Sequence, residues 1–151
     1  MVIREIIQTL PKKLTGSWIK KNSSYETGLC AEMGWIKEDS RFYDATINNI
    51  KIEIKKGINI WLDLVRYSEI LIGRGDKDTI TTFFIPDKQR TKILRIIFVD
   101  TNEIIQKLKI TMDDAEKILQ MQNKMPRQLN AQANLTIKDV ERIAFYIYEL
   151  R

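Results

Sequence analysis

The sequence predicts an α/β fold in which a mixed central β-sheet is flanked by helices. Helical patterns occupy both ends of the 151-residue chain, and an alternating hairpin pattern occupies residues 42–55. Two β-branched, apolar segments follow at residues 79–85 and 92–99. The length fits one domain, and neither an internal repeat nor a Gly/Ser/Pro-rich linker divides the chain.

The first elements are helical. Residues 1–11 form an amphipathic pattern without the apolar core or cleavage site of a signal peptide, which predicts a cytoplasmic protein. No apolar run approaches the roughly 20 residues that cross a bilayer, so no membrane association is expected. A second helix is predicted at 25–35, after the N-cap candidates Asn22, Ser23 and Ser24. It carries Glu26 and Glu32.

The hairpin and the elements after it have clear patterns. Residues 42–47 are aromatic and β-branched, Asn48-Asn49 suits a two-residue turn, and residues 50–55 alternate strictly. Residues 60–72 are predicted as a helix, followed by a turn at 73–76 and the two strands.

The C-terminal part is predicted to be helical. Helices are expected at 102–108, 111–123 and 136–150. The last two begin with the capping-box pairs Thr111/Asp114 and Thr136/Asp139.

The composition excludes several kinds of chemistry. The chain has no histidine, which removes Ser-His-Asp hydrolysis, Cys-His proteolysis and histidine-ligated zinc. The single Cys30 excludes an intrachain disulfide and multi-cysteine zinc sites, and is expected to be a small buried hydrophobe. A net charge of +5 and a pI of about 9.3 favour polyanionic partners, of which nucleic acid is the commonest; the alternative is that this charge serves solubility alone.

The hairpin brings acidic residues together. A turn at Asn48-Asn49 places Asp44 directly opposite Glu53, on the face that Lys51 and Lys55 share. Two opposed carboxylates are unfavourable unless a cation or a proton lies between them. Mg²⁺ suits such a site, the Ile54 backbone carbonyl is a natural extra ligand, and Lys55 could stabilise charge on a phosphate. The alternative is a surface hairpin with a solvated Lys/Glu face.

Asp44 followed by Glu53-Ile54-Lys55 resembles the motif of the PD-(D/E)xK nucleases, although Tyr43 stands where the motif has proline. The resemblance is greatest to small type II restriction endonucleases. It implies a restriction-endonuclease-like core over residues 24–100, a C-terminal helical part over 101–151, and catalytic residues Asp44, Glu53 and Lys55. It also implies that Asp44, Glu53 and the Ile54 carbonyl bind Mg²⁺, with Mn²⁺ as an alternative ion and with Glu26 or Glu32 as a further ligand.

The resulting hypothesis is a single-domain hydrolase over residues 1–151, a Mg²⁺-dependent, sequence-specific endonuclease of double-stranded DNA with no organic cofactor. Cutting both strands implies a homodimer, for which the apolar residues 143–148 are an interface candidate. A recognition loop is expected within 120–134. The alternatives are a Holliday-junction-resolving or repair nuclease of the same fold and a non-catalytic basic DNA-binding module. The basic residues expected to contact DNA are Lys12, Lys13, Lys20, Lys21, Lys56, Arg66, Arg74, Lys77, Lys88 and Arg90.

Overall fold

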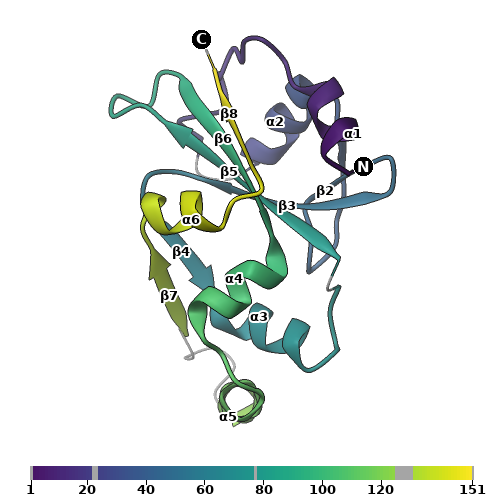
Figure 1. Ribbon diagram of the computed structural model, residues 1–151, viewed down its shortest axis with the longest axis vertical. Coiled ribbons are helices and arrows are strands. Elements are labelled where there is room, and N and C mark those ends of the chain that lie inside the picture. The colour runs from purple at the N-terminus through teal and green to yellow at the C-terminus, as the bar shows by residue number, and fades with distance from the viewer. Residues whose placement is uncertain (1, 22–23, 77, 125–130, 151) are drawn as a thin grey trace.

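A computed structural model describes residues 2–21, 24–76, 78–124 and 131–150. Its centre is a six-stranded sheet in which β3 and β5 run parallel and the other neighbours run antiparallel (Figure 1). In spatial order, the strands are β1 (Ile36–Lys37), β2 (Ala45–Ile47), β3 (Ile50–Lys56), β5 (Thr79–Pro86), β6 (Ile93–Asp100) and β8 (Tyr146–Glu149). The predicted α/β class with a mixed sheet is confirmed.

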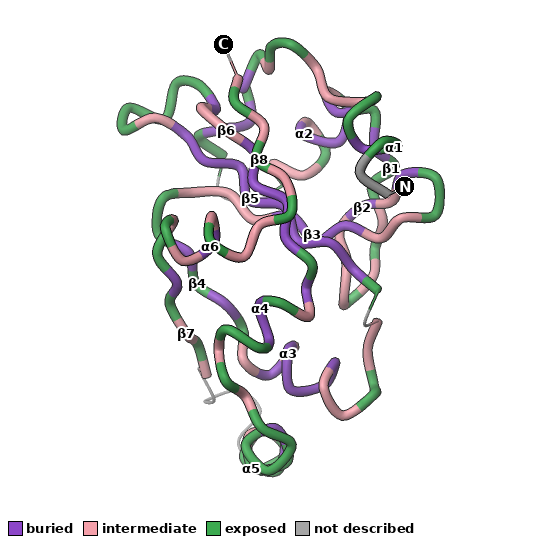
Figure 2. Tube along the Cα trace, in the orientation of Figure 1, coloured by how far each residue is buried: buried purple, intermediate pink, exposed green. Residues whose placement is uncertain are grey.

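Both faces of the sheet are covered. The helices are α1 (Val2–Thr9), α2 (Tyr25–Met33), α3 (Leu64–Leu71), α4 (Thr101–Leu108), α5 (Met112–Lys124) and α6 (Ile137–Ile143). Successive residues of a strand point to opposite faces, so Phe84 joins the apolar cluster beneath α1 and α2, whereas Phe83 joins the cluster beneath α3, α4 and α6. Figure 2 shows the strands as the buried layer between them.

The hairpin forms in the predicted register. Ala45, Thr46 and Ile47 pair with Ile52, Lys51 and Ile50, and the turn residues Asn48 and Asn49 have φ values of 47° and 69°. Positive φ at both positions is the geometry that matches the twist of a hairpin, and asparagine tolerates it. Strand β2 is shorter than predicted, because it begins at Ala45 rather than at residue 42.

The helix predicted at residues 60–72 is wrong in its first third. Residues Ile60–Asp63 form β4, which pairs with β7 (Gln132–Leu135), and α3 begins only at Leu64. The Asp63 side chain caps α3 by accepting from the Val65 backbone N–H at 3.0 Å. Burial alternates along β4 as in a strand, and the distant partner β7 supplies the pairing that local periodicity could not reveal.

The helix predicted at 136–150 is also wrong in its second half. The capping box of Thr136 and Asp139 starts α6 as expected, but the chain turns after Ile143 and Tyr146–Glu149 pairs with β6 as the edge strand β8. The dimer interface proposed on a C-terminal helix is therefore wrong in its geometry. The expected recognition loop is also corrected: Met112–Lys124 is helix and Gln132–Leu135 is strand, while residues 125–130 lie outside the described part.

The remaining predicted helices, strands and turn are confirmed to within about two residues. The capping box of Thr111 and Asp114 is present in both directions, at 3.0 and 3.1 Å. Asn22 and Ser23 lie outside the described residues, and Ser24 precedes α2 without a side-chain capping bond. Within the described ranges, none of the helices has the length and apolar character needed to span a membrane.

Candidate active site

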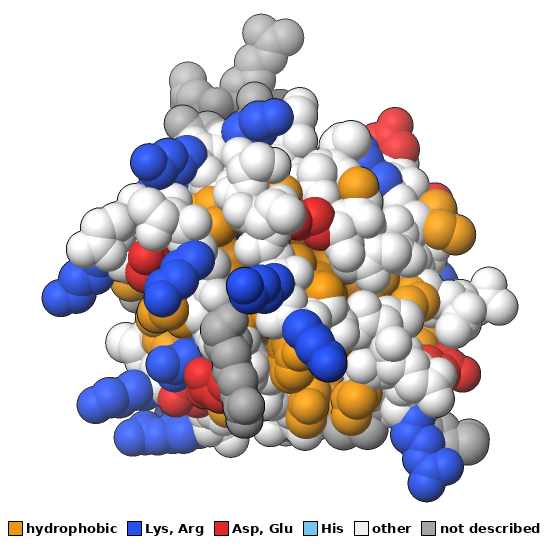
Figure 3. All heavy atoms as spheres, turned by 90° about the horizontal axis from the view of Figure 1, so that it is seen from above, with side chains coloured by type: hydrophobic (Ala, Val, Ile, Leu, Met, Phe, Trp, Pro, Cys, Tyr) orange, Lys and Arg blue, Asp and Glu red, His pale blue; other side chains and the backbone are white. Residues whose placement is uncertain are grey.

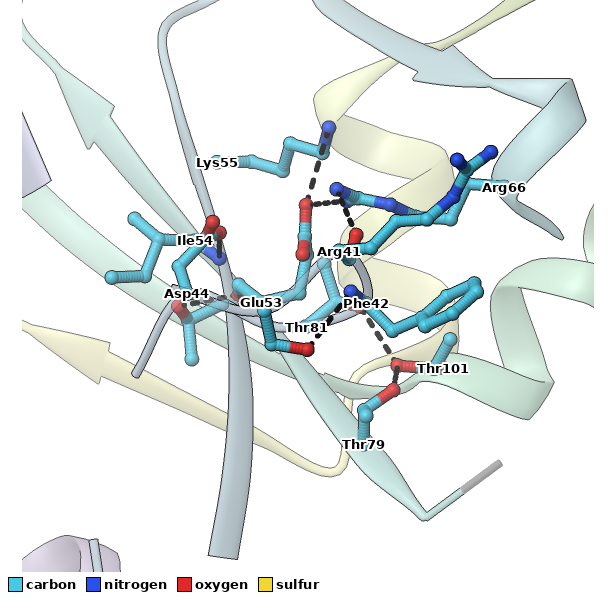
Figure 4. Close-up of polar contacts among 12 residues, drawn as sticks. Arg41, Phe42, Asp44, Glu53, Ile54, Lys55, Arg66, Thr79, Thr81 and Thr101 are labelled. Atoms are coloured by element: carbon cyan, nitrogen blue, oxygen red, sulfur yellow. Dashed lines mark hydrogen bonds and ion pairs between the residues drawn. The ribbon is translucent and has the colours of Figure 1, made fainter. Parts of the chain in front are cut away.

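Asp44 is fixed at the point where the hairpin opens. Its backbone N–H donates to the Ile52 carbonyl at 2.8 Å, and its carboxylate Oδ2 accepts from the Ile54 N–H at 2.7 Å (Figure 4). The ladder between β2 and β3 ends at the pair Ala45–Ile52, so this carboxylate takes the place of a further strand partner. Backbone N–H and C=O of one residue point to the same edge of a strand, so the Ile54 carbonyl faces the side of Asp44.

Glu53 is buried, which differs from the solvated Lys/Glu face considered as the alternative. It stands opposite Thr81 of β5, on the face that α3 covers, and is only 4% exposed. Its Oε1 contacts the Arg66 guanidinium and lies 3.6 Å from the Lys55 Nζ. Its Oε2 is buried without a hydrogen-bond partner among the described residues. One carboxylate oxygen is therefore neutralised, while the other has no donor.

This environment changes the acidity of Glu53. The pKa of its carboxyl group is raised from 4.5 to about 7: burial is the largest cause and the charge of Asp44 adds to it, while Arg66 and Lys55 act in the opposite direction. Desolvation therefore outweighs the two cations. The mutual repulsion of Asp44 and Glu53 is the effect expected from two carboxylates that the hairpin brings together.

Arg66, one of the residues predicted to contact DNA, lies at the candidate site. It extends from α3 to the Glu53 carboxylate and donates from its second nitrogen to the Arg41 carbonyl at 2.9 Å. Arg41 in turn pairs with Glu69 of α3. Sequence reasoning missed the contact between Arg66 and Glu53, because the two residues belong to different elements and no spacing rule links them.

Of the two upstream acids, Glu32 is engaged elsewhere. It accepts from the Thr15 and Gly16 N–H groups at 2.5 and 3.3 Å, and also from the Thr15 hydroxyl and the Trp18 indole. Burial alone would raise the pKa of Glu32, but these hydrogen bonds outweigh it and the pKa is lowered. Glu32 therefore holds the chain after α1 in place.

Glu26 lies in the first turn of α2, next to Tyr25. The pKa of Tyr25 is raised mainly by burial and then by the charges of Glu26, Asp44 and Glu53, so Tyr25 lies near the site. Of the two candidate extra ligands, Glu26 remains, since Glu32 is engaged by its hydrogen bonds. Even so, no group of three or more acidic, cysteine or histidine side chains that could hold a metal ion occurs within the described residues.

The basic residues fall into two groups. Lys12, Lys13, Lys20, Lys21, Arg74, Lys88 and Arg90 are exposed, and Lys77 lies outside the described residues. Lys56 is partly buried, and its ammonium group donates to the carbonyls of Ile19 and Lys21 at 2.5 and 2.6 Å. Figure 3 shows one face of the molecule, on which Lys and Arg side chains surround an apolar centre.

A buried hydroxyl cluster was not anticipated. Thr101, at the start of α4, contacts the hydroxyls of Thr79 and Thr81 at 2.6 and 2.9 Å, behind Glu53 on the same face (Figure 4). The signal in the sequence was the alternation of threonine within an otherwise apolar strand. Cys30 is buried as expected, and burial raises the pKa of its thiol to about 11, so it is not a nucleophile at neutral pH.

The oxygen atoms at this site fit a hard divalent metal ion as its ligands. Mg²⁺ is commonly held by one or two carboxylates with water completing its shell, and Glu53 offers a buried oxygen that lacks a donor. Asp44 and the Ile54 carbonyl face the same edge. Comparison of the chain with models of protein families, with curated proteins and with solved structures found no match.

Proposed function

We propose that this chain is a Mg²⁺-dependent endonuclease of double-stranded DNA, of the sequence-specific restriction type, with a restriction-endonuclease-like fold. One observation supports the proposal above all others. Glu53 is a buried carboxylate, and one of its oxygens has no hydrogen-bond donor among the described residues. It lies beside the Lys55 ammonium, and the negative charge of Asp44, next to β2, is close enough to raise its pKa. Placing a second acid beside a buried carboxylate destabilises a fold, so a functional reason is expected for the arrangement.

Asp44 and Glu53, with the Ile54 carbonyl, would hold the ion, and Mn²⁺ is an alternative because it prefers similar oxygen ligands. When bound, the ion would polarise the scissile phosphate and increase the acidity of a water molecule. Of the two upstream acids, Glu26 would be the further ligand, since Glu32 is engaged by Thr15, Gly16 and Trp18.

Lys55 supplies the positive charge on the protein side. Its ammonium group is partly exposed, with 26% of the side chain accessible, so it can donate to a phosphate oxygen or orient the attacking water. In the reaction, the water would lose a proton to solvent and its oxygen would bond to phosphorus, while the bond from phosphorus to one sugar oxygen breaks and that oxygen takes up a proton from solvent. Arg66 favours the charged form of the buried Glu53 and fixes its position, and so acts through Glu53 rather than on the substrate.

DNA would reach these groups from the side of Lys55. Beyond Ile52, β3 has no pairing with β2; Glu53 and Ile54 are buried there, whereas Lys55 and Lys56 are partly exposed. One such site cuts one strand, so double-strand cleavage in one binding event would require two copies. A homodimer is therefore part of the proposal.

The test is incubation of the purified chain with plasmid and phage DNA, with Mg²⁺ and with a chelator. Glu53→Gln should abolish Mg²⁺-dependent cleavage, whereas Glu103→Gln, an exposed change of the same type on α4, should leave it intact. Discrete fragments support a restriction-type enzyme. Cleavage of branched or damaged DNA alone would replace this with a resolving or repair nuclease, and binding without cleavage, unaffected by chelator, would contradict catalysis.

A further inference from the structure

A second feature lies on the other side of β3, beyond the candidate active site. A hollow of about 270 Å³ is bordered by the residues that follow β3 and by the hairpin between β5 and β6. The charged side chains that line it are those of Lys56, Lys88 and Arg90. Among the described lining residues there is no acid, so the hollow is cationic.

The cations in this hollow are held together by the backbone. Lys56 donates to the Ile19 carbonyl at 2.5 Å, and Arg90 Nη2 donates to the same carbonyl at 3.3 Å. The pKa of Lys56 is lowered by burial and then by the charge of Arg90, with Glu26 opposing both. No carboxylate in the described part of the chain forms an ion pair with Lys56, Lys88 or Arg90. Like charges collected without a counter-ion favour an anionic ligand.

The remaining lining suits a small anion with several oxygens. Gly57 has a φ of 127°, which only glycine adopts readily, and its N–H donates to the Phe84 carbonyl at 3.2 Å; the turn that it forms brings Asn59 to the lining of the hollow. Asn59 can donate hydrogen bonds to an oxygen acceptor. The volume is below the roughly 300–1,000 Å³ of pockets that enclose a drug-sized molecule, and thus fits a single phosphate group better than a whole cofactor.

The position of the hollow relates it to the candidate active site. Lys55 points to the face that carries Glu53, whereas Lys56 points to the opposite face, and both lie on the part of β3 that β2 leaves uncovered. Glu53 and Lys56 are three residues apart, which is about 10 Å along a strand. Lys55 and Lys56 are both partly exposed, so a nucleic-acid strand that passes the end of β3 could contact one residue on each face.

We propose that the hollow formed by Lys56, Lys88, Arg90 and the Gly57–Asn59 turn is a phosphate-binding site, separate from the Asp44/Glu53 site. It binds a phosphate group of the DNA strand and sets the position of that strand relative to Glu53. The assignment of the phosphate to DNA rests on the proposed function; the recognition of phosphate itself rests on the hollow alone.

The test measures binding with a chelator present, so that no DNA is cut. Fluorescence anisotropy with a short duplex is compared between the natural chain, the double variant Lys88→Gln/Arg90→Gln and the control Lys92→Gln. Lys92 is exposed on the same hairpin but does not line the hollow. Lys56 is left unchanged, because it also holds the Ile19 and Lys21 carbonyls.

The double variant should lose roughly tenfold or more in affinity, and its slope of log affinity against log salt should fall by about one to two. The control should change by less than about twofold. In a parallel titration with inorganic phosphate, amide NMR signals of Gly57 and Asn59 should shift in the natural chain and not in the double variant. A folded double variant with the natural spectrum elsewhere excludes general unfolding as the cause.

Two duplexes, with and without a 5′-phosphate, identify the source of the phosphate. Tighter binding of the phosphorylated duplex assigns the hollow to a strand end, and equal binding assigns it to an internal phosphodiester. Equal affinities of the double variant and the control, with no phosphate-dependent shifts, would overturn the inference. Phosphate shifts in a chain that never cleaves DNA would refute the endonuclease and leave this site standing.

Discussion

Glu53 makes the stability of the folded protein depend on pH, and Glu53→Gln should remove the part of that dependence that Glu53 contributes. In the folded chain burial raises the pKa of Glu53 from 4.5 to about 7. The folded state therefore holds a proton on this group between those two pH values, while the unfolded state has released it. An acid with a raised folded pKa gives its full stabilisation below about pH 4.5 and loses it as the pH rises through about 7.

The magnitude follows from the two pKa values. Each pH unit between them changes the free energy of unfolding by about 1.4 kcal/mol, so raising the pH from 5 to 8 should reduce stability by about 2.5 kcal/mol through Glu53 alone. Glutamine has the same shape and does not titrate. Glu53→Gln should therefore lack this part of the loss, even though the contact with Arg66 also changes, because that change is the same at both pH values.

The assay is urea unfolding at pH 5 and pH 8, without divalent ions, of the natural chain and of Glu53→Gln. The pH-dependent loss should be larger in the natural chain by about 2–3 kcal/mol, which corresponds to roughly 5–10 °C in melting temperature for a protein of this size. Glu103→Gln should show the natural pH dependence. An identical loss in both Glu53 forms would refute the conclusion that Glu53 carries a strongly raised pKa.

Three further changes test the core, a helix end and the site. Phe84 is fully buried and meets Trp18 and Trp35 edge-on at 5.9 and 6.0 Å, so Phe84→Ala should cost about 3–5 kcal/mol in urea unfolding; a loss below about 1 kcal/mol would contradict the packing. Thr136→Ala removes the capping box of α6 and should cost about 1 kcal/mol in thermal unfolding, whereas Thr136→Ser should restore most of it; equal stability of the two would argue against the cap. Arg66→Met should raise the pKa of Glu53 further, as followed by NMR of its carboxyl carbon, and an unchanged or lower pKa would show that the guanidinium does not stabilise the charged form.

The hairpin could be predicted because local chemistry determines it. Asn48 and Asn49 accept positive φ, and the alternating isoleucines of β3 define which face is apolar, so register and parity follow from sequence alone. The same reasoning predicts Asp44 directly opposite Glu53; in the structure the ladder ends one pair earlier, and the Asp44 carboxylate accepts from the Ile54 N–H instead. Sequence reasoning could not show that the second face of β3 is also covered, because α3 and α4 are brought there by distant parts of the chain.

The errors share one physical cause. Residues Ile60–Asp63 and Tyr146–Glu149 were read as helix because apolar residues recur there at helical spacing, yet both pair as strands. Their partners, β7 and β6, lie far along the chain. Strand formation depends on such partners more than helix formation does, so the β elements beyond the hairpin and the two central strands were the ones that local patterns missed.

The two proposed sites depend on a single structural feature, the early end of β2. Because the ladder stops at Ala45, the Asp44 carboxylate can bond to the Ile54 N–H, and within the described part of the chain β3 has no strand partner on that edge as far as Lys56. Alternation along that edge then sends Glu53 and Lys55 to one face and Lys56 to the other. A shift of one residue in the β3 register would place Glu53 among the apolar residues beneath α1 and α2. There the guanidinium group of Arg66 could not reach its carboxylate. The turn at Asn48-Asn49, remote from either site, is thus the part of the sequence that fixes the geometry of both.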